Sequence, residues 1–284
     1  MYIILGGTGH IGSALARILL DRGERVTVVT RREEKRGEWE KSGAEVAVVD
    51  VRDTEALRRV FSCGKRAFLL NPPAAPSSDI DVEERRTVQS IVAALDGSGL
   101  ERVVAQSTYG AQAGRNIGDL GVLYEFEEAL HRQPIGTAII RGAYYMSNWD
   151  MSLETARTDG RVNTFFPGAF KLPMVAPHDI AEFAAALLTE TTGSVGLHYI
   201  EGPERYSASD VAAAFAHALG RTVTVDTVPE GQWMDTLMAV GFSERAAESM
   251  ATMTRITLND AELPEAPVLG ATTLGQYIEA VVNS

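Results

Sequence analysis

Gly6-Gly-Thr-Gly-His-Ile-Gly12 is the stretch that decides the fold, because it directly follows an apolar run over 2–5, Tyr-Ile-Ile-Leu. Apolar residues at helical spacing come next, and a second β-type run, Val-Thr-Val-Val-Thr, covers 26–30. A strand, a glycine turn, a helix and another strand in this order are typical of a unit that binds a dinucleotide. The alternative is a glycine turn with a purely structural role.

Three of these glycines have different expected tasks. Gly6 can adopt the tight turn after the strand, and Gly9 lets backbone N–H groups approach a pyrophosphate. Gly12 lets the following helix pack close to the sheet. The positive end of that helix then faces the same pyrophosphate.

The composition limits the class of protein. The chain has 284 residues, 45% hydrophobic and 23% charged, which suits one large α/β domain, alone or with a small second lobe. A formal net charge of −12 argues against direct binding to nucleic acid. Cys63 is the only cysteine, which excludes an internal disulfide and suits a reducing compartment. The N-terminal strand leaves no room for a signal peptide and no apolar run reaches membrane-spanning length, so we expect a cytoplasmic protein.

Strands and helices are expected to alternate along the first two hundred residues. Strand-type runs occupy 2–5, 25–30, 45–49, 67–70, 102–107, 137–141 and 197–200. Runs with helical spacing occupy 11–22, 54–62, 82–96, 122–132, 177–188 and 207–219. We predict an α/β fold, a Rossmann-type doubly wound parallel sheet with helices on both faces.

The alternation breaks near residue 143 and predicts a second, discontinuous unit. We expect 1–143 to form the cofactor-binding Rossmann domain, with 174–200 rejoining it. The aromatic, irregular stretch 144–173 and the mostly helical 201–284 are expected to form a smaller substrate lobe, whose last helix closes back on the body. Such a lobe would cover the carboxyl edge of the sheet, where these folds bind ligands.

The end of the strand 26–30 indicates which coenzyme fits. NAD-specific folds place a carboxylate there for the ribose diol. Here the strand is followed by Arg31 and Arg32, whose guanidinium groups suit a 2′-phosphate. NADP(H) is therefore favoured over NAD(H). The alternative is that these arginines only pair with acidic residues of 33–38 at the surface.

The next two strands end in further candidate cofactor contacts. Asp50 and Val51 follow the third strand, where an acid and an apolar residue could flank the adenine. Asn71 and Pro72 follow the fourth strand, where a stiff turn could border the middle of the cofactor.

Several segments together resemble the NmrA-like family, atypical short-chain dehydrogenase/reductases that include NADPH-dependent quinone reductases and redox-sensing regulators. They are Gly6–Gly12, Arg31, 127–130, 137–141, 142–148, 178–181 and 201–203. The likeness spans nearly the whole chain.

The resemblance implies roles for individual residues. Those expected to line the NADP(H) groove are Thr8, His10, Ile11, Arg31, Asn71 and Ser107. Those expected near the nicotinamide and the substrate are Tyr144, Asn148 and Trp149. The alternatives are that Ser107 only caps a strand end and that Tyr144 only packs.

The usual proton-transfer pair of short-chain dehydrogenases, Tyr-x-x-x-Lys, is incomplete. Tyr124 is followed four residues later by Glu128, which would raise the pKa of the phenol rather than lower it. No lysine occurs between Lys65 and Lys171. The lysine that many NmrA-like members carry four residues before the Glu127 position is replaced by leucine. An ordinary alcohol-dehydrogenase or epimerase mechanism is therefore disfavoured.

A quinone does not require that pair, because it is already electrophilic and its reduced oxygen can take a proton from a weak donor. Tyr109, just after the fifth strand, is the best-placed candidate donor, although it could equally hold its loop by packing. The glycine-rich stretch 110–121 is interpreted as a mobile lid or as a loose surface loop.

Two functions remain open. The five histidines lack metal-ligand spacing and no Gly-x-Ser-x-Gly motif occurs, so neither a metal site nor a hydrolase is expected. The first hypothesis is an NADPH-dependent reductase of quinones or similar small carbonyl acceptors. The second is a non-catalytic NADP(H)-binding regulator that reports redox state to a protein partner. Neither hypothesis involves a membrane.

Overall fold

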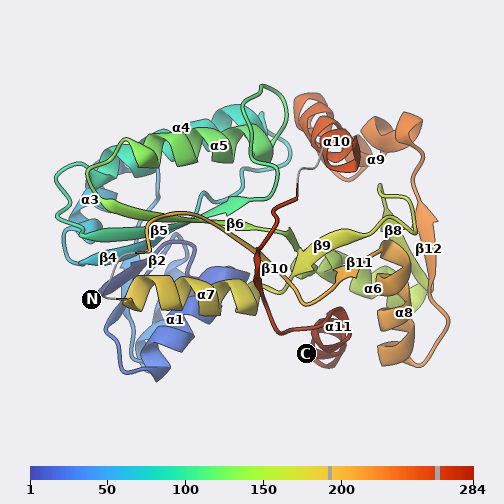
Figure 1. The fold of residues 1–284 in the computed structure, drawn as a ribbon, viewed down its shortest axis with the longest axis horizontal. Coiled ribbons are helices and arrows are strands. Elements are labelled where there is room, and N and C mark those ends of the chain that lie inside the picture. The colour runs from blue at the N-terminus through green and yellow to red at the C-terminus, as the bar shows by residue number, and fades with distance from the viewer. Residues whose placement is uncertain (191–193, 260–262) are drawn as a thin grey trace.

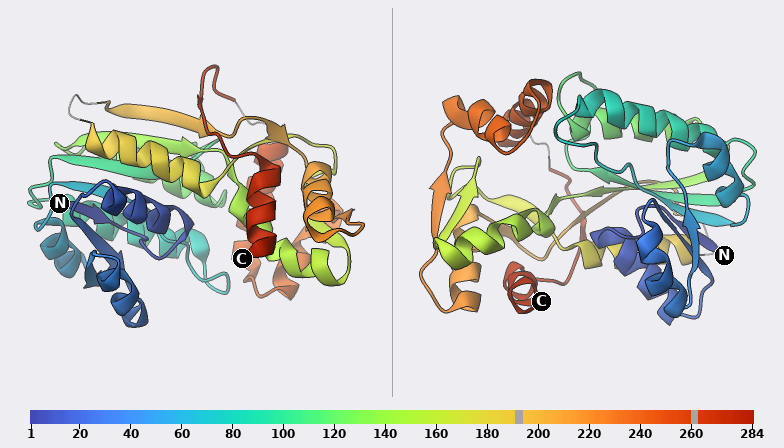
Figure 2. Two further views of the ribbon diagram at one scale, coloured as in Figure 1. Left: turned by 90° about the horizontal axis from the view of Figure 1, so that it is seen from below. Right: turned by 180° about the vertical axis from the view of Figure 1, so that it is seen from behind.

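The fold consists of a large parallel sheet between two layers of helices, joined to a second lobe (Figures 1 and 2). It is known from a computed structural model that describes residues 1–190, 194–259 and 263–284. The parts of the predicted ranges 174–200 and 201–284 that fall on 191–193 and 260–262 lie outside the described residues.

The large sheet confirms the predicted fold class. Its strands are β1 (Tyr2–Ile4), β2 (Val26–Thr30), β3 (Glu45–Val48), β4 (Arg66–Leu69), β5 (Arg102–Thr108), β6 (Gly136–Gly142), β10 (Gly196–Glu201) and β13 (Val268–Leu269). They lie in the order β13-β10-β6-β5-β4-β1-β2-β3, and every neighbouring pair is parallel. The chain builds outward from β1 to β3 and then crosses to β4, so the connections after β1 and β4 diverge. Ligands of such sheets bind in the crevice at this switch point.

Successive side chains of the central strands point to opposite faces of the sheet and pack against the two layers of helices. Ile4 of β1 packs with α1 (His10–Asp21) and α7 (Pro177–Thr189) on one face. Ile3 packs on the other face, beneath α3 (Thr54–Phe61), α4 (Ile80–Leu95) and α5 (Asp119–His131). Because both faces are covered, the strands are apolar without a polar alternation. A short helix, α2 (Arg36–Lys41), adds Trp39 to the α1 side.

The second lobe has its own core and two small sheets. Its strands pair in the orders β11-β9-β7 and β12-β8. The strands are β7 (Tyr144–Tyr145), β8 (Arg161–Thr164), β9 (Leu172–Val175), β11 (Arg205–Tyr206) and β12 (Thr224–Thr227). The helices are η2 (Met146–Ser152), α6 (Leu153–Thr158), α8 (Ala208–Leu219), α9 (Trp233–Ala239), α10 (Glu244–Asn259) and α11 (Leu274–Asn283). Met146, Phe215 and Ile278 are fully buried in this core.

Parts of the predicted substrate lobe lie against the Rossmann domain instead. Residues 268–269, which we expected in the smaller lobe, form β13 at the edge of the large sheet. The start of α10 also contacts the loop after β4, where the Ser243 hydroxyl donates to the Ser78 carbonyl oxygen at 2.7 Å. Figure 1 shows α10 on the same side of the molecule as α4 and α5. Two-residue strands such as β13 carry no readable period, which is why the sequence did not predict this one.

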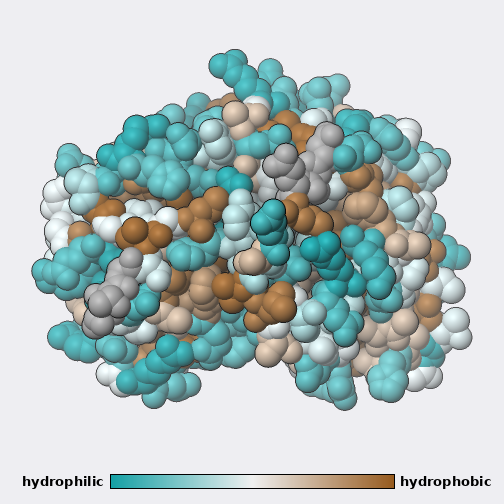
Figure 3. Space-filling model, viewed as in Figure 1, coloured by the Kyte–Doolittle hydropathy of each residue, from teal (hydrophilic) through white to brown (hydrophobic). Residues whose placement is uncertain are grey.

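The surface is mainly polar. On the face shown in Figure 3, apolar side chains form small patches separated by hydrophilic residues. None of the helices in the described ranges is both long enough and apolar enough to cross a bilayer.

A buried ion pair fastens α5 to the end of the sheet. Arg141 of β6 donates to both oxygens of Glu127, with Nε–Oε1 and Nη2–Oε2 distances of 2.8 and 2.6 Å. The Ser107 hydroxyl donates to the same carboxylate. The side chains of Glu127 and Arg141 are only 5% and 13% exposed. A pair this deeply buried is costly to break, because the remaining charge is left without a partner.

Replacing Glu127 with alanine is expected to reduce the free energy of unfolding by about 3–5 kcal/mol, because Arg141 then stays buried and unpaired. Urea denaturation measures this loss. The matched control is Glu128→Ala, one residue along the same helix, whose carboxylate is 47% exposed. We expect it to change stability by less than about 0.5 kcal/mol. Equal losses in the two variants would show that the Glu127 pair is not a structural tie.

Candidate functional site

The glycine turn after β1 is sterically fixed. Gly6 has a φ of +65°, a left-handed conformation that favours glycine. A Cβ atom on Gly12 would overlap the Gly6 carbonyl oxygen, which is backbone and cannot move aside. Gly7, which our sequence analysis did not assign, is equally confined, because a Cβ there would overlap Val28 of β2. Its signal was present in the sequence, since Gly7, Gly9 and Gly12 form the Gly-x-Gly-x-x-Gly pattern.

Gly9 faces free space at the positive end of α1. It is the N-cap residue of that helix, and no side chain caps the helix. A Cβ on Gly9 would meet only the Gly6 carbonyl oxygen, at 3.4 Å. Backbone N–H groups at an uncapped helix start attract anions. The turn therefore has the geometry that a pyrophosphate requires.

The other predicted residues of this turn differ in what they can offer. The Ile11 side chain is 6% exposed and packs between α1 and α7, so only its backbone is available to a ligand. Thr8 and His10 are both accessible. The imidazole of His10 lies 3.8 Å from Asp150 of the second lobe, measured from Nε2 to Oδ2.

The arginines after β2 are available. Arg31 and Arg32 are exposed, and neither has an acidic partner within 4.0 Å among the described residues. Two nearby acidic residues that could have formed ion pairs with these arginines are paired with other basic residues. Glu33 binds Arg36 at 2.6 Å and Glu38 binds Lys35 at 2.9 Å. The structure thus does not bear out the alternative that these two acids neutralise the arginines.

The residues after β3 and β4 stand in different environments. Asp50 is exposed, and its Oδ1 accepts the Arg52 N–H at 3.0 Å. Val51 is 8% exposed and packs on the α3 side of the sheet. Asn71 is followed by the half-buried Pro72, and its Oδ1 is buried without a hydrogen-bond partner in the described part of the chain. An unpaired buried oxygen costs about 1–3 kcal/mol, and a donor on a bound ligand would remove that penalty.

Ser107 and Tyr109 are engaged within the protein. Ser107 is 1% exposed and its hydroxyl donates to Glu127, so this side chain is part of the buried ion-pair cluster. The Tyr109 hydroxyl donates to Glu201 Oε2 at 3.3 Å. Burial, followed by the negative charge of Glu201, raises the pKa of the Tyr109 phenol. This makes Tyr109 a weaker acid than a solvated tyrosine, which is unfavourable for the predicted role of proton donor.

The three predicted substrate residues lie together at the start of the second lobe. The Tyr144 ring centroid is 6.0 Å from that of Trp149, and its hydroxyl is hydrogen-bonded to Asn148. Burial raises the pKa of Tyr144 to about 12. Trp149 is 4% exposed and belongs to the core of the lobe, so its side chain mainly packs. Tyr144 is half-buried and Asn148 is exposed, so both remain accessible to a ligand.

Asp150 brings this group to the glycine turn. Its Oδ2 faces His10, and its Oδ1 accepts the Tyr277 hydroxyl of α11 at 2.9 Å. Burial raises the pKa of Asp150. The start of α1, the η2 segment and the C-terminal helix therefore meet at one point, which brings the segment that carries Asn148 and Trp149 to the candidate pyrophosphate site.

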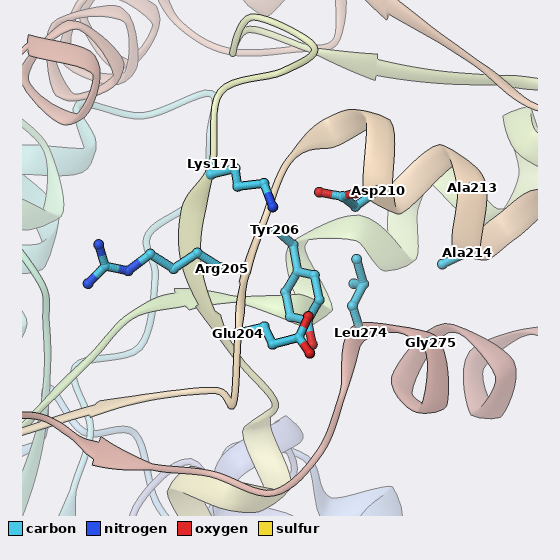
Figure 4. A pocket seen from close by; sticks show the side chains of 9 residues that line it. All are labelled: Lys171, Glu204, Arg205, Tyr206, Asp210, Ala213, Ala214, Leu274 and Gly275. Atoms are coloured by element: carbon cyan, nitrogen blue, oxygen red, sulfur yellow. The ribbon is translucent and has the colours of Figure 1, made fainter.

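Two other features do not join this site. The described residues contain no group of three or more His, Cys, Asp or Glu side chains arranged to hold a metal ion. A pocket of about 180 Å³ lies in the second lobe between β11, α8 and α11 (Figure 4). In that view Lys171 points toward Asp210 while the Arg205 guanidinium points away. None of the predicted site residues lines it.

Comparison with known proteins identifies the family. The sequence profile of the NmrA-like family matches residues 2–280, and the chain belongs to that family. It is 23% identical over 257 residues to the NAD(P)H azoreductase of Xenophilus azovorans, covering 88% of this chain and 85% of that protein.

Two solved structures share the fold. The triphenylmethane reductase of Citrobacter sp. complexed with NADP(H) gives a TM-score of 0.82 at 18% identity, covering 99% of each chain. The NADPH-dependent quinone oxidoreductase of Escherichia coli complexed with NADPH gives a TM-score of 0.80 at 20% identity, again over 99% of each chain. At these identities the likeness shows the fold.

The glycine turn leads to opposite outcomes for two similar substitutions. Gly9→Val should fold normally but lose NADPH binding, because the new side chain fills the space beside the α1 amides. Gly12→Val should lose about 3 kcal/mol of stability, the upper end for overpacking, because its clash is with backbone. Gly37→Val is the control, since a Cβ at Gly37 meets nothing within 4 Å. Thermal melting and calorimetry with NADPH distinguish them, and full NADPH affinity in Gly9→Val would contradict this site.

Proposed function

We propose that the protein is an NADPH-dependent reductase of quinones or similar small carbonyl acceptors. The observation that carries the proposal is the uncapped start of α1 at the glycine turn, together with Arg31, which follows the neighbouring strand β2 and has no acidic partner among the described residues. A pyrophosphate and a 2′-phosphate are the two anionic groups of NADPH, and they match these two positions. Family membership and the NAD(P)H azoreductase relative agree with a reductase.

The residues present fit the coenzyme. The backbone around Gly9 and His10 would hold the pyrophosphate, and Arg31 would hold the 2′-phosphate, with Arg32 beside it. The unpaired Oδ1 of Asn71 supplies an acceptor at the end of β4. Asp50 and Val51 would border the adenine. The bound coenzyme would supply hydride, and the protein would supply the orientation of the two reactants.

The acceptor would occupy the space near Tyr144 and Asn148. These side chains start the second lobe and lie near the glycine turn through the contact of Asp150 with His10. A quinone or another conjugated carbonyl compound is electrophilic enough to accept hydride without a Tyr-x-x-x-Lys pair. Holding it against the nicotinamide would supply much of the rate.

The second candidate function is a non-catalytic NADP(H)-binding regulator with a protein partner. The observation that favours it is the lack of the usual proton-transfer machinery. Glu128 stands at the lysine position of the Tyr124 motif, and the Tyr109 proton is held by Glu201. The same coenzyme site would serve a sensor, because coenzyme binding without turnover can order the contact between the Rossmann domain and the second lobe.

Arg31→Asp is expected to weaken NADPH binding by at least about 10–100-fold, the value of a lost charge-assisted contact, while NADH binding changes little. The control is Arg25→Asp, which makes the same charge change just before β2, at the opposite end of that strand. Calorimetry with both coenzymes measures the effect. An equal loss of affinity for NADPH and NADH would refute contact with the 2′-phosphate.

Turnover separates the two candidate functions. With a panel of quinones and related carbonyl compounds, the reductase should consume NADPH in the steady state, as followed by the loss of its absorbance. Tight NADPH binding without turnover on any acceptor would reject the enzyme and leave the regulator. Failure to bind either coenzyme would reject both.

A further inference from the structure

Two carboxyl groups from different helices meet beside the candidate coenzyme site. Glu84 lies on α4 and is 5% exposed, and Asp119 is the first residue of α5. Their side chains are hydrogen-bonded to each other. Glu84 Oε1 also accepts the Ala74 N–H at 2.9 Å. Two carboxyl groups can share a hydrogen bond only when one of them carries a proton.

The surroundings keep that proton in place at neutral pH. A third acid, Asp81, is 3% exposed and lies near both groups, while the nearby Arg85 binds Asp81 and Glu125 at 3.3 and 3.0 Å. Burial, followed by the charge of Asp119, raises the pKa of Glu84 to about 8. Burial and the charge of Asp81 also raise the pKa of Asp119. Like charges this close cannot both ionise readily.

The pair lies at the carboxyl edge of the sheet. Ala74 belongs to the loop that follows β4, and Asp119 ends the loop that follows β5. Asp119 also lies close enough to Tyr145 of β7 for its charge to raise the pKa of that phenol, after the larger effect of burial. Tyr145 in turn accepts a hydrogen bond from Gln106 Nε2 at 2.9 Å.

An independent observation indicates that a ligand belongs at this edge. Gln106 is 3% exposed, yet its Oε1 has no hydrogen-bond partner within the described residues. A buried amide oxygen nearly always has a donor, so a bound ligand or an ordered water is expected to supply one here. Asp119 keeps solvent-accessible surface although protein atoms surround its carboxyl group, whereas Glu84 is buried, so Asp119 is the member of the pair that a ligand can reach.

We propose that Glu84 and Asp119 form a shared-proton pair, and that Asp119 donates this proton to the acceptor once hydride has been transferred. The inference rests on the proposed reductase function. A bound NADPH would supply hydride, which carries two electrons, and would be left as NADP⁺, so a quinone that accepts the hydride would be a hydroquinone monoanion. The monoanion takes the proton from Asp119 and leaves as hydroquinone. The pair, now doubly ionised, takes a proton from water before the next turnover.

This assignment supplies the acid that the rest of the site lacks. Tyr109 is a poor donor, and the Tyr124 motif has no lysine. A carboxyl group with a pKa near the working pH combines a large protonated fraction with a ready release, which is the optimum for general acid catalysis. Burial of Glu84 is what keeps the proton on the pair.

The first test needs no turnover. Because the pKa of Glu84 is raised in the folded protein, its protonation adds stability at low pH, and this is lost as the pH rises toward about 8. Relative to Glu84→Gln, the unfolding equilibrium constant of the wild type should rise by up to tenfold per pH unit between about pH 5 and pH 8. Asp119→Asn provides a second comparison if Glu84→Gln does not fold. Parallel pH profiles for the wild type and the variant would overturn the shared proton.

The second test is kinetic. The kcat/KM of the wild type for a quinone should be level at acid pH and fall tenfold per unit above the pKa of the pair. Asp119→Asn should lower kcat about 10²–10⁴-fold and remove this fall, while the Kd for NADPH stays the same. Glu128→Gln, on the same helix, is the control and should behave like the wild type.

The outcomes separate this inference from the proposed function. An unchanged pH profile and rate in Asp119→Asn, with an active wild type, would overturn Asp119 as the donor and leave the reductase intact. No turnover by the wild type would overturn the reductase itself, and the donor role with it. The pH dependence of stability would then still report whether the pair holds a proton.

Discussion

The contact of Gly12 with the Gly6 carbonyl oxygen is the constraint on which the rest of the site depends. It brings the first turn of α1 against the end of β1 at a distance that only glycine permits. This contact aims uncapped N–H groups at the crevice between the loops after β1 and β4. The central position of β1 in the sheet then sets the surroundings, with β2 and its arginines on one side and β4 with Asn71 on the other.

The second lobe completes the site through few direct contacts. Asp150 joins the glycine turn to Tyr277 of the last helix, and Ser243, which directly precedes α10, holds the loop after β4. Because the lobe comes from separated stretches of chain, these contacts bring residues far apart in sequence to one edge of the sheet. We propose that Tyr144, Asn148 and Asp119 gather near the candidate coenzyme site in this way, without forming a recognisable local motif.

The sequence predicted the helices and strands that are determined by residues close together in the chain. The helix α1 begins one residue before its predicted start, and β2 differs by one residue at its N-terminal end, since apolar periodicity and glycine spacing define both. Arg31 could be predicted to follow β2 directly, because its position depends only on where that strand ends, and its contact with a 2′-phosphate stays a prediction. By contrast, β13 and the placement of α10 depend on tertiary contacts that no short pattern encodes.

The side-chain pairs likewise depend on tertiary contacts that the sequence alone does not show. The ion pair of Glu127 with Arg141 and the hydrogen bond of Glu84 with Asp119 join residues 14 and 35 positions apart. Each pair arises only when the sheet brings α5 against its neighbours. Tyr109 was placed correctly after β5, but its partner Glu201 comes from β10, so the sequence could not show that its proton is held.

A crystal structure of the protein bound to NADPH tests the central claim most directly. The account predicts the pyrophosphate against the backbone of Gly9 and His10, the 2′-phosphate against Arg31, and the nicotinamide directed toward Tyr144 and Asp119. A coenzyme bound away from the glycine turn, or with its 2′-phosphate free in solvent and Arg31 uninvolved, would contradict it.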